Sequence, residues 1–281
     1  MLPSYFILDP LLKNWLQEDI GRGDRSTSGI LWNHAKGGQA HWVVKETGVI
    51  AGLPVANRVF QLLNSTVRFI PTVAEGEYCE AQTIIAEIEG PLDALLTGER
   101  VSLNLAMRLS GIATATRAYV EEIADLQVRL VDTRKTTPGL RVLEKYATFI
   151  GGAINHRFGL DDAIMIKDNH IQAAGSIEEA ITRIRKTMPY PLSIEVETSN
   201  LEEVKQALNM GVEIIMLDNM TVSEMKDAVQ LIRHHSGGVK IEASGNITLE
   251  NIRSVALTGV DYISTSAPIT RSTWLDLSMR I

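Results

Sequence analysis

Residues 192–219, LSIEVETSNLEEVKQALNMGVEIIMLDN, contain the pattern that decides the fold of this chain. They begin with an apolar strand at 192–196, continue in an amphipathic helix at 201–210 that Gly211 ends, and reach a second strand at 213–217. Both strands are rich in Ile, Val and Leu, as strands of a parallel sheet covered on both faces are. Two such strands joined by a helix indicate a right-handed βαβ crossover.

The same unit repeats along the second half of the chain. Further helices are predicted at 176–187, 222–235 and 249–258, and Ser176 forms a capping box with Glu179 at the start of the first. Successive strands lie roughly 22 to 35 residues apart, which suits parallel crossovers. No G-x-G-x-x-G sequence follows any strand, so a barrel is favoured over a dinucleotide-binding sheet. The predicted strands are residues 128–131, 163–166, 192–196, 213–217, 240–243 and 261–264.

The first hundred residues do not show this repeat. Strands are predicted at 39–46, 48–51, 67–71 and 82–88, and helices at 54–63 and 92–123, the second of them broken near Gly111. Residues 271–281 alternate between apolar and polar side chains, which predicts a strand that returns to pair with the N-terminal sheet. We therefore divide the chain into an N-terminal α+β domain at 1–113, joined by 271–281, and an α/β domain at 114–270.

Bulk composition excludes several classes of protein. The 281 residues are 45% hydrophobic and 22% charged, which is typical of a globular protein. A formal charge of −7 argues against a surface for nucleic acid, whose phosphates attract basic residues. Cys79 is the single cysteine, so disulfides within the chain are excluded and a reducing compartment is favoured. The N-terminus lacks the features of a secretion signal, and no apolar run is long enough for a membrane span. We expect a cytoplasmic protein with no membrane partner.

Ionisable or small polar side chains follow every predicted strand of the second half. In an α/β barrel the working residues lie at the carboxyl ends of the strands. One polar strand end is as easily explained by solvation as by function, but a complete set indicates a binding site. These segments are residues 132–139, 167–170, 195–197, 218–219, 244–246 and 264–268.

Basic side chains dominate the earlier strand ends, and acidic side chains the later ones. So many cations at one opening would repel one another unless a ligand with several carboxylates or phosphates bound there. Glu197 and Asp218 end adjacent strands, and two carboxylates there suit Mg²⁺ or a developing positive charge on a sugar. Glu195 shares a face with Glu197, so periodicity does not choose between them. The basic residues are Arg134, Lys135, His156, Arg157 and Lys167.

Small residues follow the last two strands, where many barrels bind phosphate through backbone N–H groups. They are Ser244, Gly245 and Asn246 after the fifth strand, and Thr265 and Ser266 after the sixth. A plain turn would also explain Ser-Gly-Asn, and only its position favours a phosphate site.

Several of these segments resemble quinolinate phosphoribosyltransferases. The similarity covers nearly the whole chain and is most specific between Asp132 and His170. The matching segments are DTRKTTPGLR (132–141), EKYA (144–147), GG (151–152), NHR (155–157), GL (159–160), IKDNH (166–170), EVE (195–197), MLDN (216–219), EASGN (242–246), EDIGRGD (18–24), GERVSLN (98–104) and SGIAT (110–114).

The resemblance implies an N-terminal sandwich-like domain and an incomplete, TIM-like parallel α/β barrel, assembled as a homodimer or a hexamer. It implies that quinolinate and phosphoribosyl pyrophosphate react to give nicotinate mononucleotide, pyrophosphate and carbon dioxide in NAD biosynthesis. Arg100 would reach quinolinate in the neighbouring subunit. The dicarboxylate would also be held by Arg134, His156, Arg157 and Lys167.

The resemblance assigns the remaining residues to the sugar phosphate. Thr133 belongs to the substrate site, and Lys135, Glu197 and Asp218 would attend phosphoribosyl pyrophosphate and its Mg²⁺. Lys135 and Lys167 are candidates for proton transfer, with structural ion pairs as the alternative. The chain departs from the family pattern at Ser266-Ala-Pro268. The 5′-phosphate would be bound by Ser244, Gly245, Asn246, Thr265, Ser266 and Ala267.

Three other functions compete with this interpretation. A relative from the same family with another acceptor, such as nicotinate or the substrate of the molybdenum-operon homologue, would release no carbon dioxide. A barrel aldolase or isomerase would use Lys167 as a Schiff-base lysine. A binding protein without catalysis is disfavoured by the complete set of cations and carboxylates.

Overall fold

The computed structural model describes residues 2–32, 36–235 and 237–281. Its contacts divide the chain into two compact units, each with its own hydrophobic core. Unit 1 comprises Met1–Arg117, Thr137–Gly152 and Arg271–Ile281, and unit 2 comprises Ala118–Thr136 and Ala153–Thr270.

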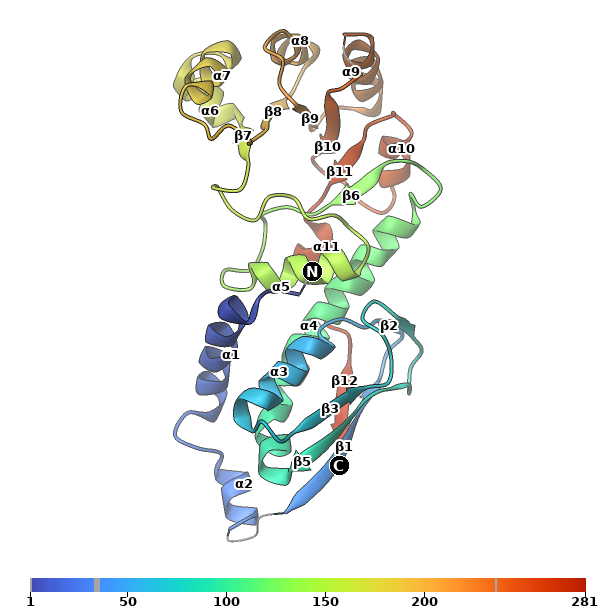
Figure 1. Cartoon of the computed structure of the whole chain (residues 1–281). Helices are drawn as coiled ribbons and strands as arrows, with labels where there is room; N and C mark the ends of the chain where they lie inside the picture. Colours follow the sequence, from blue (N-terminus) through green and yellow to red (C-terminus); the bar gives the residue numbers. More distant parts are fainter. Residues whose placement is uncertain (1, 33–35, 236) are drawn as a thin grey trace. The chain divides into compact units, whose positions relative to one another are not determined.

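Unit 2 contains a parallel sheet in the order β6-β11-β10-β9-β8-β7 (Figure 1). The first and last strands of unit 2, β6 and β11, are neighbours, and the order is otherwise sequential, as it is around a barrel. Among the described residues, β6 and β7 are not paired, and an isolated bridge joins Val131 to Ile154 on that side. The predicted incomplete barrel is therefore confirmed. The strands are β6 (Arg129–Val131), β7 (Ile164–Ile166), β8 (Ile194–Thr198), β9 (Ile214–Asp218), β10 (Lys240–Ser244) and β11 (Tyr262–Ser264).

Helices of unit 2 follow the strands and contact one another in sequence (Figure 1). Their apolar stripes and the strands form one core, with Ile166, Val196 and Ile241 fully buried. The capping box predicted at Ser176 is half correct, because its hydroxyl accepts the Glu179 N–H while the Glu179 carboxylate binds Arg183 instead. The helices are α6 (Asp168–Ala174), α7 (Ile177–Arg185), α8 (Leu201–Asn209), α9 (Val222–His235), α10 (Ile252–Ala256) and α11 (Ala267–Thr270).

Unit 1 contains an antiparallel sheet in the order β12-β1-β5-β3, with a small β2-β4 pair beside it. Trp42, Phe60 and Phe69 pack with ring centroids 5.4 to 6.5 Å apart in its core. The strand predicted at the C-terminus is confirmed, since β12 pairs with β1. The strands are β1 (Gly37–Val44), β2 (Gly48–Val49), β3 (Arg68–Pro71), β4 (Tyr78–Cys79), β5 (Ile84–Pro91) and β12 (Leu277–Arg280).

The helices of unit 1 include three that the sequence did not predict. They are α1, α2 and α5. In the described part of the chain, no helix combines the length and the hydropathy that a bilayer span requires. The helices are α1 (Tyr5–Ile20), α2 (Arg25–Ile30), α3 (Leu53–Leu63), α4 (Leu92–Glu121) and α5 (Arg141–Ile150).

The division into units differs from the predicted domains at residues 114–117 and, over a longer stretch, at residues 137–152. These residues were assigned to the α/β domain, but their contacts group them with unit 1. The buried Glu144 carboxylate binds Arg108 of α4 at 2.8 Å, and the Tyr146 hydroxyl donates to Glu75 at 2.5 Å. Buried polar contacts of this kind hold a segment firmly, because breaking them leaves groups without partners.

The predicted break near Gly111 is wrong, because α4 is continuous through that residue. A Cβ built at Gly111 would lie 1.9 Å from the Thr273 carbonyl oxygen. The glycine therefore lets the backbone at 273–274 pass close to the helix.

Replacing Gly111 by alanine is expected to lower the stability of the protein by roughly 1–3 kcal/mol, the usual cost of overpacking. Gly29→Ala in α2 is the matched control, because nothing lies within 4 Å of the added Cβ. That change should be neutral or stabilise by up to about 1 kcal/mol through helix propensity. Thermal unfolding of both variants tests the idea, which fails if the two melt at the same temperature.

Candidate active site

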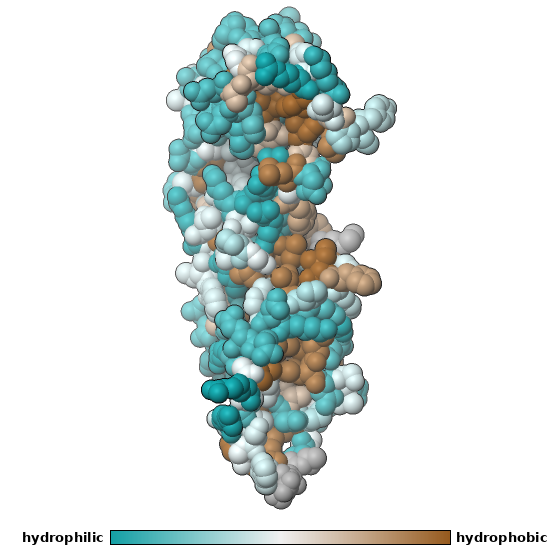
Figure 2. Space-filling model, turned by 90° about the vertical axis from the view of Figure 1, so that its left-hand side faces the viewer, coloured by the Kyte–Doolittle hydropathy of each residue, from teal (hydrophilic) through white to brown (hydrophobic). Residues whose placement is uncertain are grey.

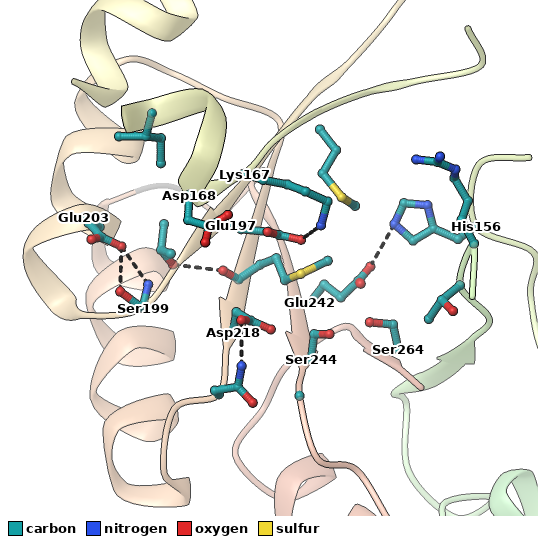
Figure 3. A pocket seen from close by; sticks show the side chains of 18 of the residues that line it. His156, Lys167, Asp168, Glu197, Ser199, Glu203, Asp218, Glu242, Ser244 and Ser264 are labelled. Atoms are coloured by element: carbon teal, nitrogen blue, oxygen red, sulfur yellow. Dashed lines mark hydrogen bonds and ion pairs between the residues drawn. The ribbon is translucent and has the colours of Figure 1, made fainter. Parts of the chain in front are cut away.

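A cavity of about 940 Å³ lies at the carboxyl ends of the parallel strands in unit 2 (Figure 3). Carboxylates, cations and small hydroxyl side chains from successive strand ends point into it. The structure therefore brings together most of the residues predicted from sequence. Those that line the cavity are Thr133, Arg134, Lys135, His156, Arg157, Lys167, Glu197, Asp218, Ser244, Gly245 and Asn246.

Four predicted residues do not line this cavity. Thr265 and Ala267 are buried. The Thr265 hydroxyl donates to the Ile247 carbonyl oxygen and accepts the Ala267 N–H. The Ser266 carbonyl accepts N–H groups at the start of α11. Arg100 belongs to unit 1, where it lines a separate cavity of about 660 Å³. Their substrate contacts remain predictions.

The loop after β6 is tied to the segment before β7 through Asp132. Its carboxylate is buried and accepts the His156 N–H at 2.8 Å and the Asn155 side-chain amide at 2.7 Å. The Thr133 hydroxyl accepts the Lys135 N–H at 3.0 Å. These bonds bring Lys135 and His156, which are far apart in sequence, to one cavity wall.

Lys167 and Glu197 form an ion pair within the cavity (Figure 3). Lys167 follows β7 and Glu197 lies on the paired strand β8, so the sheet places them side by side. The Glu197 side chain is 17% exposed and that of Lys167 is 41% exposed. The carboxylate of Glu197 engages the Lys167 nitrogen, whereas a Schiff-base lysine must present its nitrogen free to a carbonyl carbon. The geometry therefore argues against the aldolase interpretation.

Arg134 and Arg157 place two guanidinium groups in the same cavity. Burial, and then the charge of Arg134, lower the pKa of the Arg157 guanidinium. Arg157 donates to the Ala163 carbonyl at 2.8 Å, while the buried Nε of Arg134 has no hydrogen-bond partner among the described residues. Two neighbouring cations with an unused donor form a site that an anion would stabilise.

Backbone strain shapes the opposite wall. Asn219 and Asn246 both have positive φ, at 56° and 52°, and the Asn246 amide donates to Asn219 Oδ1 at 3.1 Å. Gly245 has φ 96°, and a Cβ there would lie 2.2 Å from Asn219 Oδ1. Only glycine fits, and non-glycine residues in this region cluster at functional sites. The Asn219 amide also donates to Asp218 at 2.7 Å, which fixes that carboxylate.

Sequence reasoning missed Glu242, which lines the cavity from β10. Burial and the charge of Glu195 raise the pKa of the Glu242 carboxyl to about 7. Its position two residues before Ser244 places both on one face of the strand, a signal present in the sequence. The same alternation explains why Glu195 and Glu197 both point inward, which periodicity had left open.

The donor set fits a magnesium ion. Glu197 and Asp218 both line the cavity from adjacent strands, and each supplies the hard carboxylate oxygens that Mg²⁺ prefers.

A barrel opening with this set of cations, carboxylates and a strained small-residue loop defines an enzyme that binds phosphorylated or carboxylated substrates. Comparison with known proteins makes the class specific. The family model described as "Quinolinate phosphoribosyl transferase, C-terminal domain" matches residues 112–280, and the model of the corresponding N-terminal domain matches residues 26–110. The chain belongs to the quinolinate phosphoribosyl transferase family.

Individual relatives match along more than nine tenths of their length. A probable carboxylating nicotinate-nucleotide pyrophosphorylase of Synechocystis sp. is 62% identical over 280 residues, which is 100% of this chain and 94% of that protein. The carboxylating nicotinate-nucleotide pyrophosphorylase of Homo sapiens is 37% identical over 98% of this chain and 91% of its own length. The crystal structure of NadC from Streptococcus pyogenes superposes with a TM-score of 0.94 at 41% identity, covering 100% of this chain and 98% of that one.

Proposed function

We propose that this protein is a decarboxylating quinolinate phosphoribosyltransferase, a pentosyltransferase of NAD biosynthesis. It joins quinolinate to phosphoribosyl pyrophosphate and yields nicotinate mononucleotide, pyrophosphate and carbon dioxide. The observation that carries the proposal is the cavity itself, where Arg134, Arg157 and Lys167 lie with Glu197 and Asp218. One opening thus contains cations that can bind a dicarboxylate. It also contains carboxylates that can bind a metal-bound sugar phosphate.

The basic wall binds and orients quinolinate. Arg134 and Arg157 grip its carboxylates, because guanidinium groups match the geometry of a carboxylate and their mutual repulsion is relieved by an anion. Lys167 completes this set by leaving Glu197 for a substrate carboxylate. Holding both substrates in reacting geometry supplies a large part of the acceleration, since a bimolecular step becomes effectively unimolecular.

The acidic wall and the Gly245 loop bind the sugar phosphate. Ser244, Gly245 and Asn246 offer hydroxyl and backbone N–H donors to the 5′-phosphate. Glu197 and Asp218 would hold Mg²⁺ with the pyrophosphate, and the ion would offset negative charge on that leaving group. Lys135, which lines the same cavity, would add to this neutralisation. The same two carboxylates also favour positive charge on the sugar carbon.

The chemistry proceeds in two balanced steps. The pyridine nitrogen forms a bond to the anomeric carbon as the bond to pyrophosphate breaks. The ring, now cationic, accepts the electron pair left when the adjacent carboxylate departs as carbon dioxide, and that carbon then takes up a proton. Lys135 and Lys167 are the ammonium groups of the cavity that can donate it.

The assembly is part of the same proposal. We expect a cytoplasmic homodimer or hexamer in which Arg100 serves the neighbouring subunit. Figure 2 shows hydrophobic patches on the face it displays, and such patches often mark protein interfaces. Exposed large apolar residues of unit 1 include Tyr5, Phe6, Ile7, Ile30, Trp32 and Trp274.

The direct test is turnover. The purified protein, given quinolinate labelled in its 2-carboxylate, phosphoribosyl pyrophosphate and Mg²⁺, should release labelled carbon dioxide and nicotinate mononucleotide in equal amounts. Nicotinate in place of quinolinate should react at least about a hundredfold more slowly, since a site built for a charged group leaves its cations unpaired without it. Faster use of nicotinate, with no carbon dioxide, would favour the related acceptor enzymes.

A further inference from the structure

His156, which lines the cavity, is held by two buried acidic residues, of which Figure 3 shows Glu242. Its Nε2 lies 3.2 Å from Glu195 Oε2 and 3.7 Å from Glu242 Oε2. Its Nδ1 accepts the Arg157 N–H at 2.7 Å. The ring is therefore contacted from β8, from β10 and from its own chain neighbour.

These contacts define which nitrogen carries the proton. Because Nδ1 accepts an N–H, its lone pair is in use and the ring proton lies on Nε2, which faces Glu195 Oε2 at 3.2 Å. The three side chains are close enough to hold a metal ion, with ligand atoms within 4.8 Å of one another. A metal at Nε2 would require the proton on Nδ1, where it would meet the Arg157 N–H. The geometry thus favours hydrogen bonding over metal binding.

The two carboxylates are almost completely buried, although burial of a charged group is unfavourable. Glu195 is 3% exposed and Glu242 is 4% exposed, and one oxygen of each has no hydrogen-bond partner among the described residues. Burying two such groups costs free energy, so a structural or functional role must offset that cost. The contact that both share is His156.

We infer that Glu195 and Glu242 are positioning residues for the quinolinate pocket. They fix the His156 ring, whose Nδ1 in turn fixes the main chain at Arg157 and so aims the guanidinium at the substrate carboxylate. The second bond of Arg157, to the Ala163 carbonyl, completes this alignment. The inference rests on the proposed function, because it assigns the dicarboxylate to Arg157.

Kinetics of Glu195 variants give the first test. Glu195→Ala should raise KM for quinolinate by about tenfold or more, the range for a lost hydrogen bond to a charged group, while kcat and KM for phosphoribosyl pyrophosphate change less than about threefold. Glu195→Gln keeps an acceptor oxygen for Nε2–H and should recover most of the loss. Equal effects on both substrates, or no rescue by glutamine, would overturn the inference. Glu213→Gln, the same change just before β9, should leave all constants unaltered, since its oxygen still accepts the Ile194 N–H.

The tautomer of His156 gives a second test that needs no substrate. In the full protein labelled with ¹⁵N-histidine, the signals lost in His156→Gln should show a protonated Nε2 and a bare Nδ1 at neutral pH. The opposite tautomer, or a shift of these signals on adding Zn²⁺ alone, would refute the positioning role even if quinolinate is converted. Correct tautomers in a protein that does not convert quinolinate would instead refute the proposed function.

Discussion

Replacing Lys167 by alanine is expected to lower kcat/KM for quinolinate by thirtyfold to several thousandfold. Lys167 contributes a cation to the substrate and also pairs with Glu197 inside the cavity. Its removal leaves Glu197, only 17% exposed, as an uncompensated negative charge facing two polyanionic substrates. Once bound substrates cover this partly exposed pair, truncating one partner costs roughly 2–5 kcal/mol, which corresponds to that range of rates.

The control separates this loss from a general loss of charge. Lys186→Ala removes an exposed lysine at the end of α7 and should change kcat/KM by less than about twofold. The double variant Lys167→Ala/Glu197→Gln should regain thermal stability without regaining activity, because it removes the unpaired charge but not the need for a cation. Lys167→Ala activity within threefold of the parent would remove Lys167 from the site.

The parallel strands could be predicted because they are short runs of Val, Ile and Leu between helices with clear apolar stripes. Helix α5 could not, since its buried positions include Glu144, Lys145 and Thr148, whose burial depends on tertiary partners. Helix α1 buries Leu8, Leu12 and Leu16 at helical spacing, but Pro10 within it hides the pattern. The sequence thus predicts elements with an uninterrupted apolar pattern and misses those in which polar burial or a proline hides that pattern.

The site follows the same rule. Residues directly after strands, such as Lys167 and Asp218, were found because strand ends of a barrel meet at one opening. Glu242 lies inside a strand and not at its end, so the strand-end rule does not select it. Its place in the site follows from the tertiary contact with His156, which sequence neighbours do not predict. The orientation of Asn219 and Gly245 depends on a contact across two loops, so the sequence predicts that Gly245 belongs to the site but not why a glycine is required there.

Mixing two inactive variants is expected to restore activity if Arg100 serves the neighbouring subunit. Arg100 lies in unit 1 on α4, its side chain is 59% exposed, and its nearest carboxylate, Glu99, is 3.8 Å away. Because an exposed ion pair at this distance is weak, the Arg100 guanidinium can still bind a ligand carboxylate. A heterodimer of Arg100→Ala and Lys167→Ala subunits would contain one site with both residues intact. Random pairing gives half heterodimers, so activity should reach about a quarter of the parent level.

The matched control pairs two variants that damage the same barrel opening. Lys167→Ala mixed with Asp218→Asn leaves every site with one defect, whichever subunit supplies Arg100, and should stay inactive. Subunits should be mixed after reversible dissociation, with heterodimers quantified by mass spectrometry and turnover measured by carbon dioxide release. Heterodimers that form without exceeding the activity of the parents would place the action of Arg100 within its own subunit, because complementation requires that the two residues come from different chains.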